Sequence, residues 1–192
     1  MIYSVYKNIR DNAWQFLIDY NIKSLPVDLL YIAESAGIQV VRNSDVNILS
    51  GGESGRCIYN EKKDKWHLIY DDECTVGRRR FTIAHELAHI FLGHELIYGE
   101  TGRTFSSDKP QSEIEADTFA MRLLAPACVL KELGITTAED IEKLCGISKT
   151  SAKIRVQRMA KLYKNSDHFY ESPLEKQVGE SFKYFIDENK QR

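Results

Sequence analysis

The sequence predicts an α+β fold that is mainly helical, with a small antiparallel or mixed sheet next to a helix that carries two closely spaced histidines. Three observations support this prediction. Apolar residues recur at helical spacing along most of the chain. Residues 38–70 contain β-rich segments and a polar turn. The pentapeptide His-Glu-Leu-Ala-His follows this stretch at residues 85–89, inside an apolar run.

Two amphipathic helices are predicted at the start of the chain. The first has apolar residues at helical spacing: Val5, Ile9, Ala13, Trp14 and Leu17. The second begins at Pro26 and ends at Gly37, because proline favours a first helical turn and glycine a helix end. Its inward-facing residues are predicted to be Leu29, Leu30, Ile32 and Ala33.

Three short strands should follow. Ile38 to Val41 forms the first, and Arg56 to Asn60 and Trp66 to Tyr70 flank a polar turn, as in a hairpin. In peptidases, an edge strand beside a metal can hold an extended substrate by strand addition. The alternative is an ordinary hairpin, and the sequence does not separate the two.

The next helix carries the pentapeptide. Thr75 is a suitable N-cap and Gly93 a suitable stop, which gives about 18 residues. His85 and His89 lie about 40° apart around the helix axis and project from one face. Two neutral imidazoles in this arrangement form half of a tetrahedral zinc site, and Glu86 can serve as general base for a water at the metal. Two solvated histidines are the alternative, but the apolar flanks indicate burial.

A third ligand is expected further along the chain. His94 lies five residues after His89, which does not match the metzincin spacing, so we interpret it as a helix-end residue. The cysteines form no Cys-x-x-Cys pair. A helix between Pro110 and Pro126 offers a better candidate. There, Glu113 is favoured as the ligand, with Glu115 as its rival.

Asp117 supports this choice. It lies four residues after Glu113, so the two acids share a helix face on which they would otherwise repel each other. Asp117 is predicted to accept a hydrogen bond from the other N–H of a ligand histidine. A solvated acidic helix start, favoured by the helix dipole, is the alternative.

These two segments resemble the ImmA/IrrE metallopeptidases. The resemblance rests on Arg-Phe-Thr-Ile-Ala-His-Glu-Leu-Ala-His at residues 80–89 and on Glu-x-Glu-Ala-Asp-x-Phe-Ala-x-x-Leu-Leu-x-Pro at residues 113–126. It implies a gluzincin-like fold with zinc held by His85, His89 and Glu113, and Glu86 as the base. It also implies regulated cleavage of a helix-turn-helix repressor, often one of a mobile genetic element or prophage.

We therefore predict a zinc-dependent endopeptidase with Zn²⁺ as its cofactor. Two alternatives remain at this stage: a metal-bearing regulator that binds a repressor or DNA without cutting, and a DNA-binding protein with a structural metal. The residue that stabilises the oxyanion is not assigned. The candidates are Tyr70, Tyr98, His94 and His168.

A second informative segment spans residues 138–164. Ile141, Leu144 and Cys145 pattern one helix, and Ile154, Val156 and Met159 pattern the next, at helix-turn-helix spacing. The segment is rich in basic residues and contains no acid from its first lysine to its last: Lys143, Lys149, Lys153, Arg155, Arg158, Lys161 and Lys164. DNA binding or docking to an acidic partner is possible, but a solvated basic face on structural helices is favoured.

Composition sets the remaining limits. With 192 residues, 43% of them hydrophobic, the chain can bury a substantial core. The net charge of −2 gives no whole-chain argument for nucleic-acid or membrane binding. No signal peptide or ~20-residue apolar span is found, and four dispersed cysteines fit a reducing compartment, so we expect a cytoplasmic protein. We divide it into a peptidase core (1–135), basic helices packed on the core (136–165) and a polar, poorly ordered tail (166–192).

Overall fold

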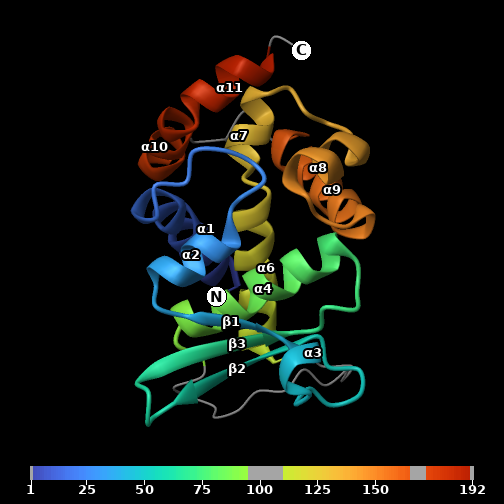
Figure 1. Ribbon diagram of the computed structural model, residues 1–192. Coiled ribbons are helices and arrows are strands. Elements are labelled where there is room, and N and C mark those ends of the chain that lie inside the picture. Colours follow the sequence, from blue (N-terminus) through green and yellow to red (C-terminus); the bar gives the residue numbers. More distant parts are fainter. Residues whose placement is uncertain (1, 95–109, 165–171, 191–192) are drawn as a thin grey trace. The chain divides into compact units, whose positions relative to one another are not determined.

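The computed structural model describes residues 2–94, 110–164 and 172–190 (Figure 1). The chain forms two compact units. One consists of Met1–Val27 together with Met121–Arg192, and the other of Asp28–Ala120. The fold is the predicted α+β class, mainly helical with one small mixed sheet. Over the described residues, no helix is both long and apolar enough to cross a membrane.

The unit Asp28–Ala120 is built on a three-stranded sheet. Its strands are β1 (Gln39–Arg42), β2 (Gly55–Asn60) and β3 (Lys65–Tyr70), in the order β1-β3-β2. β2 and β3 form the predicted antiparallel hairpin, with Cys57 opposite Leu68. β1 pairs parallel with β3, which makes the sheet mixed.

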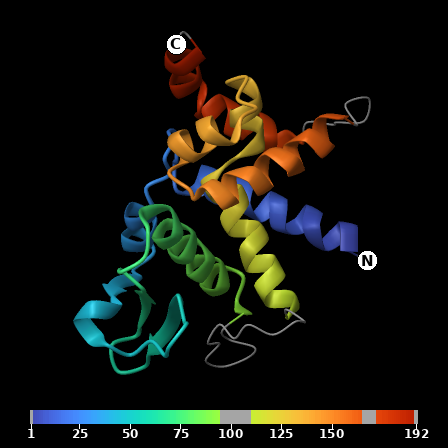
Figure 2. The same cartoon turned by 90° about the vertical axis from the view of Figure 1, so that its right-hand side faces the viewer.

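In the described part of this unit, two longer helices and two short ones accompany the sheet. α2 (Leu29–Ser35) precedes β1, α3 (Asn43–Val46) follows it, and α4 (Val76–Phe91) packs against β2 and β3 (Figure 1). The first ten residues of α6 (Gln111–Leu124) complete the unit. They lie beside α4 in both ribbon views (Figures 1 and 2).

Helix α4 has the predicted limits. Thr75 is the extended N-cap residue, although its side chain makes no capping hydrogen bond. The helix ends before Gly93, whose φ of +73° is a left-handed conformation that suits glycine. Every residue from Thr82 to His89 is buried. The two histidines therefore lie in a largely apolar interior, where polar groups need partners.

The other unit is entirely helical in its described part. α1 (Ile2–Asp19) packs against α10 (Pro173–Ser181), which also contacts α7 (Ala127–Glu132) and α11 (Lys183–Lys190). α8 (Ala138–Cys145) packs against α9 (Lys149–Lys164) across the predicted turn. The large apolar side chains at the centre of this unit include Trp14, Leu17, Leu130, Ile141 and Phe182.

The second predicted helix begins later than expected. Asp28, not Pro26, precedes it, because the Asp28 carboxylate accepts hydrogen bonds from the backbone N–H groups of Leu30 and Tyr31 at 3.1 and 3.0 Å. The helix then buries Leu29, Ile32 and Ala33, whereas Leu30 is 59% exposed. The prediction that Leu30 faces inward was wrong, because Leu29, Ile32 and Ala33 share one side of the helix at i, i+3 and i+4 spacing and Leu30 lies outside it.

Two predictions for the C-terminal half also need correction. Residues 166–192 were expected to be poorly ordered, but α10 and α11 occupy 173–190 and bury Val178, Phe182 and Ile186 at a spacing of four residues. The second correction concerns α9, where Ile154 was expected to belong to the apolar side and Arg155 to the basic face. Ile154 is instead exposed, and Arg155 is only 4% exposed. The buried side of α9 is formed by Ala152, Arg155 and Met159, so Arg155 does not belong to the exposed basic face.

Candidate metal centre

Two helices bring the predicted ligand residues together. From α4, the Nε2 atoms of His85 and His89 lie 2.9 Å apart. From α6, Oε2 of Glu113 lies 3.4 Å from Nε2 of His85, and Oε1 lies 3.1 Å from Nε2 of His89. Each of the three side chains offers one ligand atom, and these atoms all lie within 4.8 Å of one another. The group can hold a metal ion.

The electrostatics of the centre favour an ionised Glu113. Burial alone would raise the pKa of this carboxyl. Hydrogen bonds from His85 and His89, together with their positive charge when protonated, outweigh burial and hold the pKa of Glu113 well below its usual range. A carboxylate that stays ionised is available as a ligand to a cation over the whole physiological pH range.

His85 is fixed from the side opposite the centre. Its Nδ1 lies 2.9 Å from Oδ1 of Asp117, the residue predicted to accept a hydrogen bond from a ligand histidine. If Nδ1 carries the proton and donates to Asp117, Nε2 directs its lone pair toward the side of Glu113. Glu113 and Asp117 thus contact the two different ring nitrogens of His85.

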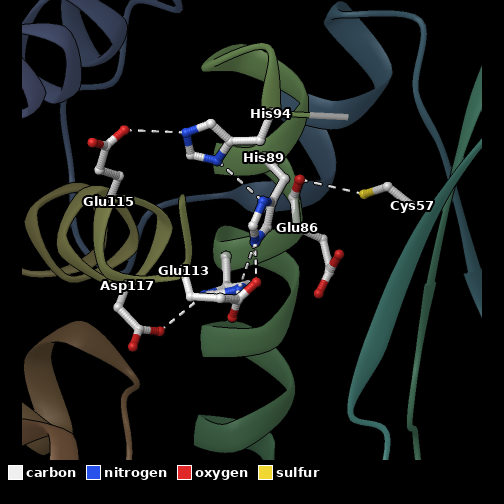
Figure 3. A network of polar contacts seen from close by, with 8 residues as sticks. Cys57, Glu86, His89, His94, Glu113, Glu115 and Asp117 are labelled. Atoms are coloured by element: carbon white, nitrogen blue, oxygen red, sulfur yellow. Dashed lines mark hydrogen bonds and ion pairs between the residues drawn. The ribbon is translucent and has the colours of Figure 1, made fainter. Parts of the chain in front are cut away.

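His94 takes a position that the sequence did not suggest. It is buried, and its Nδ1 lies 3.1 Å from Nδ1 of His89. Its Nε2 lies 3.2 Å from Oε2 of Glu115 (Figure 3). Burial, with the neighbouring His89, lowers the pKa of His94 even though Glu115 favours the charged form. Among the described residues, His94 and Glu115 are outside the group of possible ligands. His94 contacts His89, a member of the group, and Glu115 contacts His94.

Glu86 is buried against the sheet. Only 3% of it is exposed, and its backbone carbonyl accepts a hydrogen bond from the thiol of Cys57 on β2 at 3.3 Å. Gly55, at the start of β2, packs so closely that a Cβ there would lie 3.2 Å from Oε1 of Glu86. In Figure 3 the Glu86 carboxylate lies on the strand side of α4, away from Glu113. It is therefore close to the histidines in sequence without belonging to the ligand group.

Not every candidate from the sequence reaches this centre. Tyr70 is half-buried at the end of β3, and no contact with the ligand group is found for it among the described residues. Tyr98 and His168 lie outside the described residues. Residues Lys149, Lys153, Arg158 and Lys161 are exposed on α9, in the other compact unit.

Comparison with known proteins assigns the same region. The family model for the IrrE N-terminal-like domain, Peptidase_M78, matches residues 33–167. This range includes α4, α6 and each residue of the possible metal site. No match is found among curated proteins.

Proposed function

Because the chain belongs to the IrrE N-terminal-like family of peptidases, we propose that it is a zinc-dependent endopeptidase that hydrolyses internal peptide bonds. One observation carries the proposal. Two imidazoles and a carboxylate converge on one point, while Glu86, a second buried carboxylate that follows His85 on the same helix, is outside the group. A site with three protein ligands and a separate base is typical of catalytic rather than structural zinc.

The donor set fits zinc in its chemistry and in its spacing. Zinc is commonly held in peptidases by two histidines and one glutamate. A tetrahedral ion with bonds of about 2.0–2.2 Å has its ligand atoms about 3.3–3.6 Å apart. The separations among His85, His89 and Glu113 are 2.9, 3.4 and 3.1 Å, so one falls in this range and the other two are shorter by 0.2–0.4 Å. When bound, zinc supplies Lewis acidity, which makes water nucleophilic near neutral pH and polarises the scissile carbonyl.

The protein's own contribution to the reaction is assigned mainly to Glu86. Its carboxylate accepts a proton from the attacking water and later delivers that proton to the leaving amine. General acid–base catalysis of this kind contributes about 10²–10⁴-fold. The close packing of Gly55 against Glu86 restricts the carboxylate to one region beside β2. A base that is held in place loses less free energy to reorganisation at each turnover.

The sheet suggests how a substrate backbone is held. In the strand order β1-β3-β2 of the described residues, β2 is an edge strand of the sheet. An extended peptide can add to such an edge by strand pairing. Because β2 begins at Gly55, against Glu86, a peptide added there lies near the proposed base.

We also propose that the substrate is a helix-turn-helix repressor of a mobile element or prophage, cleaved in the cytoplasm. The resemblance to ImmA/IrrE metallopeptidases supports the substrate. Four cysteines without a disulfide support the reducing compartment.

The test compares the zinc-loaded protein with its Glu86→Gln variant on a purified helix-turn-helix repressor. The variant should keep its zinc in elemental analysis and its helical circular dichroism spectrum, yet lose hydrolysis by about 10²–10⁴-fold. Loss of zinc in the variant would show that Glu86 is a ligand and contradict the general-base role. Binding of the repressor by the normal protein without any cleavage would support a non-cleaving regulator instead.

The ligand assignment has its own test. Glu113→Ala should reduce zinc retention far more than Glu115→Ala, because Glu113 offers an oxygen to the centre and Glu115 contacts it only through other side chains. Both carboxylates are on α6 and only two residues apart, so the variants are matched in helix position. The reverse order would show that the third ligand is Glu115.

A further inference from the structure

A chain of hydrogen-bonding groups extends from His89 away from the ligand group. His89 Nδ1 faces His94 Nδ1 at 3.1 Å, and His94 Nε2 faces Glu115 Oε2 at 3.2 Å. Glu115 Oε1 in turn accepts a hydrogen bond from Nε2 of Gln111 at 2.9 Å. Figure 3 shows the imidazole of His94 between the ring of His89 and the Glu115 carboxylate.

Only one arrangement of protons satisfies this chain when both histidines are neutral. A neutral imidazole has one N–H and one lone pair. If Nε2 of His89 directs its lone pair toward the centre, Nδ1 of His89 carries the proton. This N–H then donates a hydrogen bond to Nδ1 of His94. The proton of His94 must then be on Nε2, from which it donates to Glu115. Each donor along the chain meets an acceptor, and the chain ends at a carboxylate.

The local backbone positions His94 for this contact. The turn after α4 contains Gly93 with φ of +73°, which lets the chain reverse and returns the next side chain toward the helix. His94 is 5% exposed, so its ring has little freedom to turn toward solvent. On the other side, Gln111 holds the second oxygen of Glu115.

We propose that His94 and Glu115 form a positioning pair that fixes the tautomer and the ring orientation of His89. The inference rests on the proposed zinc site and assigns roles to two residues outside the ligand set. His85 receives the same support directly from Asp117 at 2.9 Å. The two ligand histidines are thus each tied to a carboxylate of α6, one directly and one through an inserted imidazole.

The geometry separates this role from ligation. His94 contacts His89 at Nδ1, whereas Glu113 contacts His89 at Nε2. These two nitrogens are on different sides of the ring, so His94 and Glu113 approach His89 from different directions. Glu115 is directed to His94 rather than to His85 or His89.

The first test reads the proton positions in the unaltered, zinc-loaded protein. Long-range ¹H–¹⁵N NMR correlations of labelled histidines distinguish a proton on Nδ1 from one on Nε2. We expect the Nδ1–H tautomer for His89 and the Nε2–H tautomer for His94. A proton on Nδ1 of His94, or a zinc-dependent shift that shows His94 itself to be a ligand, would overturn the proposal. This test needs no variant and so does not depend on whether one folds.

The second test is a cycle of zinc affinities, measured by competition with a chromophoric chelator. Loss of such a supporting partner typically weakens metal binding about 10–100-fold. His94→Ala and Glu115→Ala should each weaken zinc binding in this range, and the double variant should be no weaker than His94→Ala, since Glu115 acts through His94. Additive losses would overturn the proposal, because they require Glu115 to act independently.

Two further variants complete the experiment. His94→Gln should recover most of the affinity, because an amide can accept from His89 and donate to Glu115. His67→Gln, which changes a half-buried histidine of β3 outside the ligand group, should leave the affinity unchanged. If the unaltered protein does not bind zinc, the proposed function fails. If it does and His94→Ala binds equally well, only the present inference fails.

Discussion

Gly55→Ala is predicted to disturb the proposed base without touching a ligand. A Cβ at residue 55 would lie 2.5 Å from Cγ2 of Thr82 and 3.1 Å from Cγ of Glu86. Non-bonded carbon atoms prefer about 3.5–4.0 Å, so both contacts are too short. Thr82 cannot easily move aside, because it is buried in α4 and its β-branched side chain has few allowed rotamers. The strain must therefore displace Glu86 or separate β2 from α4.

The size of the effect follows from this geometry. Adding one methyl group to a tightly packed core costs about 1–3 kcal/mol. For a chain of this length, the midpoint of thermal unfolding should fall by roughly 2–12 °C. Displacement of a catalytic group by about 1 Å can cost about 10²-fold in rate. Zinc retention should stay unchanged, since Glu86 lies outside the ligand group.

The assays are thermal unfolding, elemental analysis and cleavage rate, with two matched controls. Gly51→Ala adds the same methyl group in the preceding loop, where no atom lies within 4 Å, and should change stability by less than about 0.5 kcal/mol. Adding Thr82→Ser to Gly55→Ala removes the closest clashing atom and should restore most of the stability. Normal stability and activity in Gly55→Ala alone, or no recovery with Thr82→Ser, would refute the reasoning.

Three further predictions concern the whole chain. Removal of zinc by a chelator should lower the unfolding midpoint and re-addition should restore it, because a ligand at 100 times its Kd stabilises the folded state by about 2.7 kcal/mol; an unchanged midpoint would argue against a zinc site. At pH 8, a thiol reagent should modify the partly exposed Cys74 at least about tenfold faster than Cys128, since burial raises the pKa of Cys128 to about 12; equal rates would contradict the packing. Charge reversal at Lys149, Lys153 and Arg158 should impair cleavage of a protein substrate or have no effect. Titration at physiological salt showing a sequence preference for one duplex, lost in that variant, would instead indicate a DNA-binding protein.

The helices that the sequence located well are those with strong local signals. α4 and α6 were expected from apolar spacing, a capping residue, a stop glycine and two prolines, and their observed limits agree closely. The hairpin was expected from two β-rich segments around a polar turn. The parallel pairing of β1 with β3 was not derivable, because it depends on contacts between segments that are distant in sequence.

Burial in α9 shows where periodicity alone fails. The apolar residues Ile154 and Val156 suggested one buried side, but the helix buries Arg155. Burial, followed by the positive charges of Arg155, Arg10 and Arg158, lowers the pKa of Arg122 to about 10. A hydrophobicity pattern counts every arginine as a surface residue and gives no sign of such an arrangement.

The spacing of the candidate ligands and the contact of Asp117 with a ligand histidine were predicted from the sequence, whereas the contacts of His94 were not. Helical geometry alone places His85 and His89 on one face of α4, and Glu113 and Asp117 on one face of α6. The contact of His94 with both His89 and Glu115 requires the turn at Gly93 and the packing of α6 beside α4. These are tertiary features, and a histidine five residues after another has no preferred direction that the sequence could reveal.

The alternation of acids on α6 has a physical consequence for folding. Glu113 and Asp117 share a face, and like charges four residues apart destabilise an isolated helix by about 0.2–0.5 kcal/mol. In the folded chain both face the imidazole of His85, and Glu113 gains a further contact with His89. The contacts of these acids with His85 and His89 of α4 offset this repulsion, and a cation held between the helices would strengthen the attraction between them. Metal binding and the docking of α6 on α4 should thus be coupled. Each ligand variant should weaken metal binding and also destabilise the start of α6.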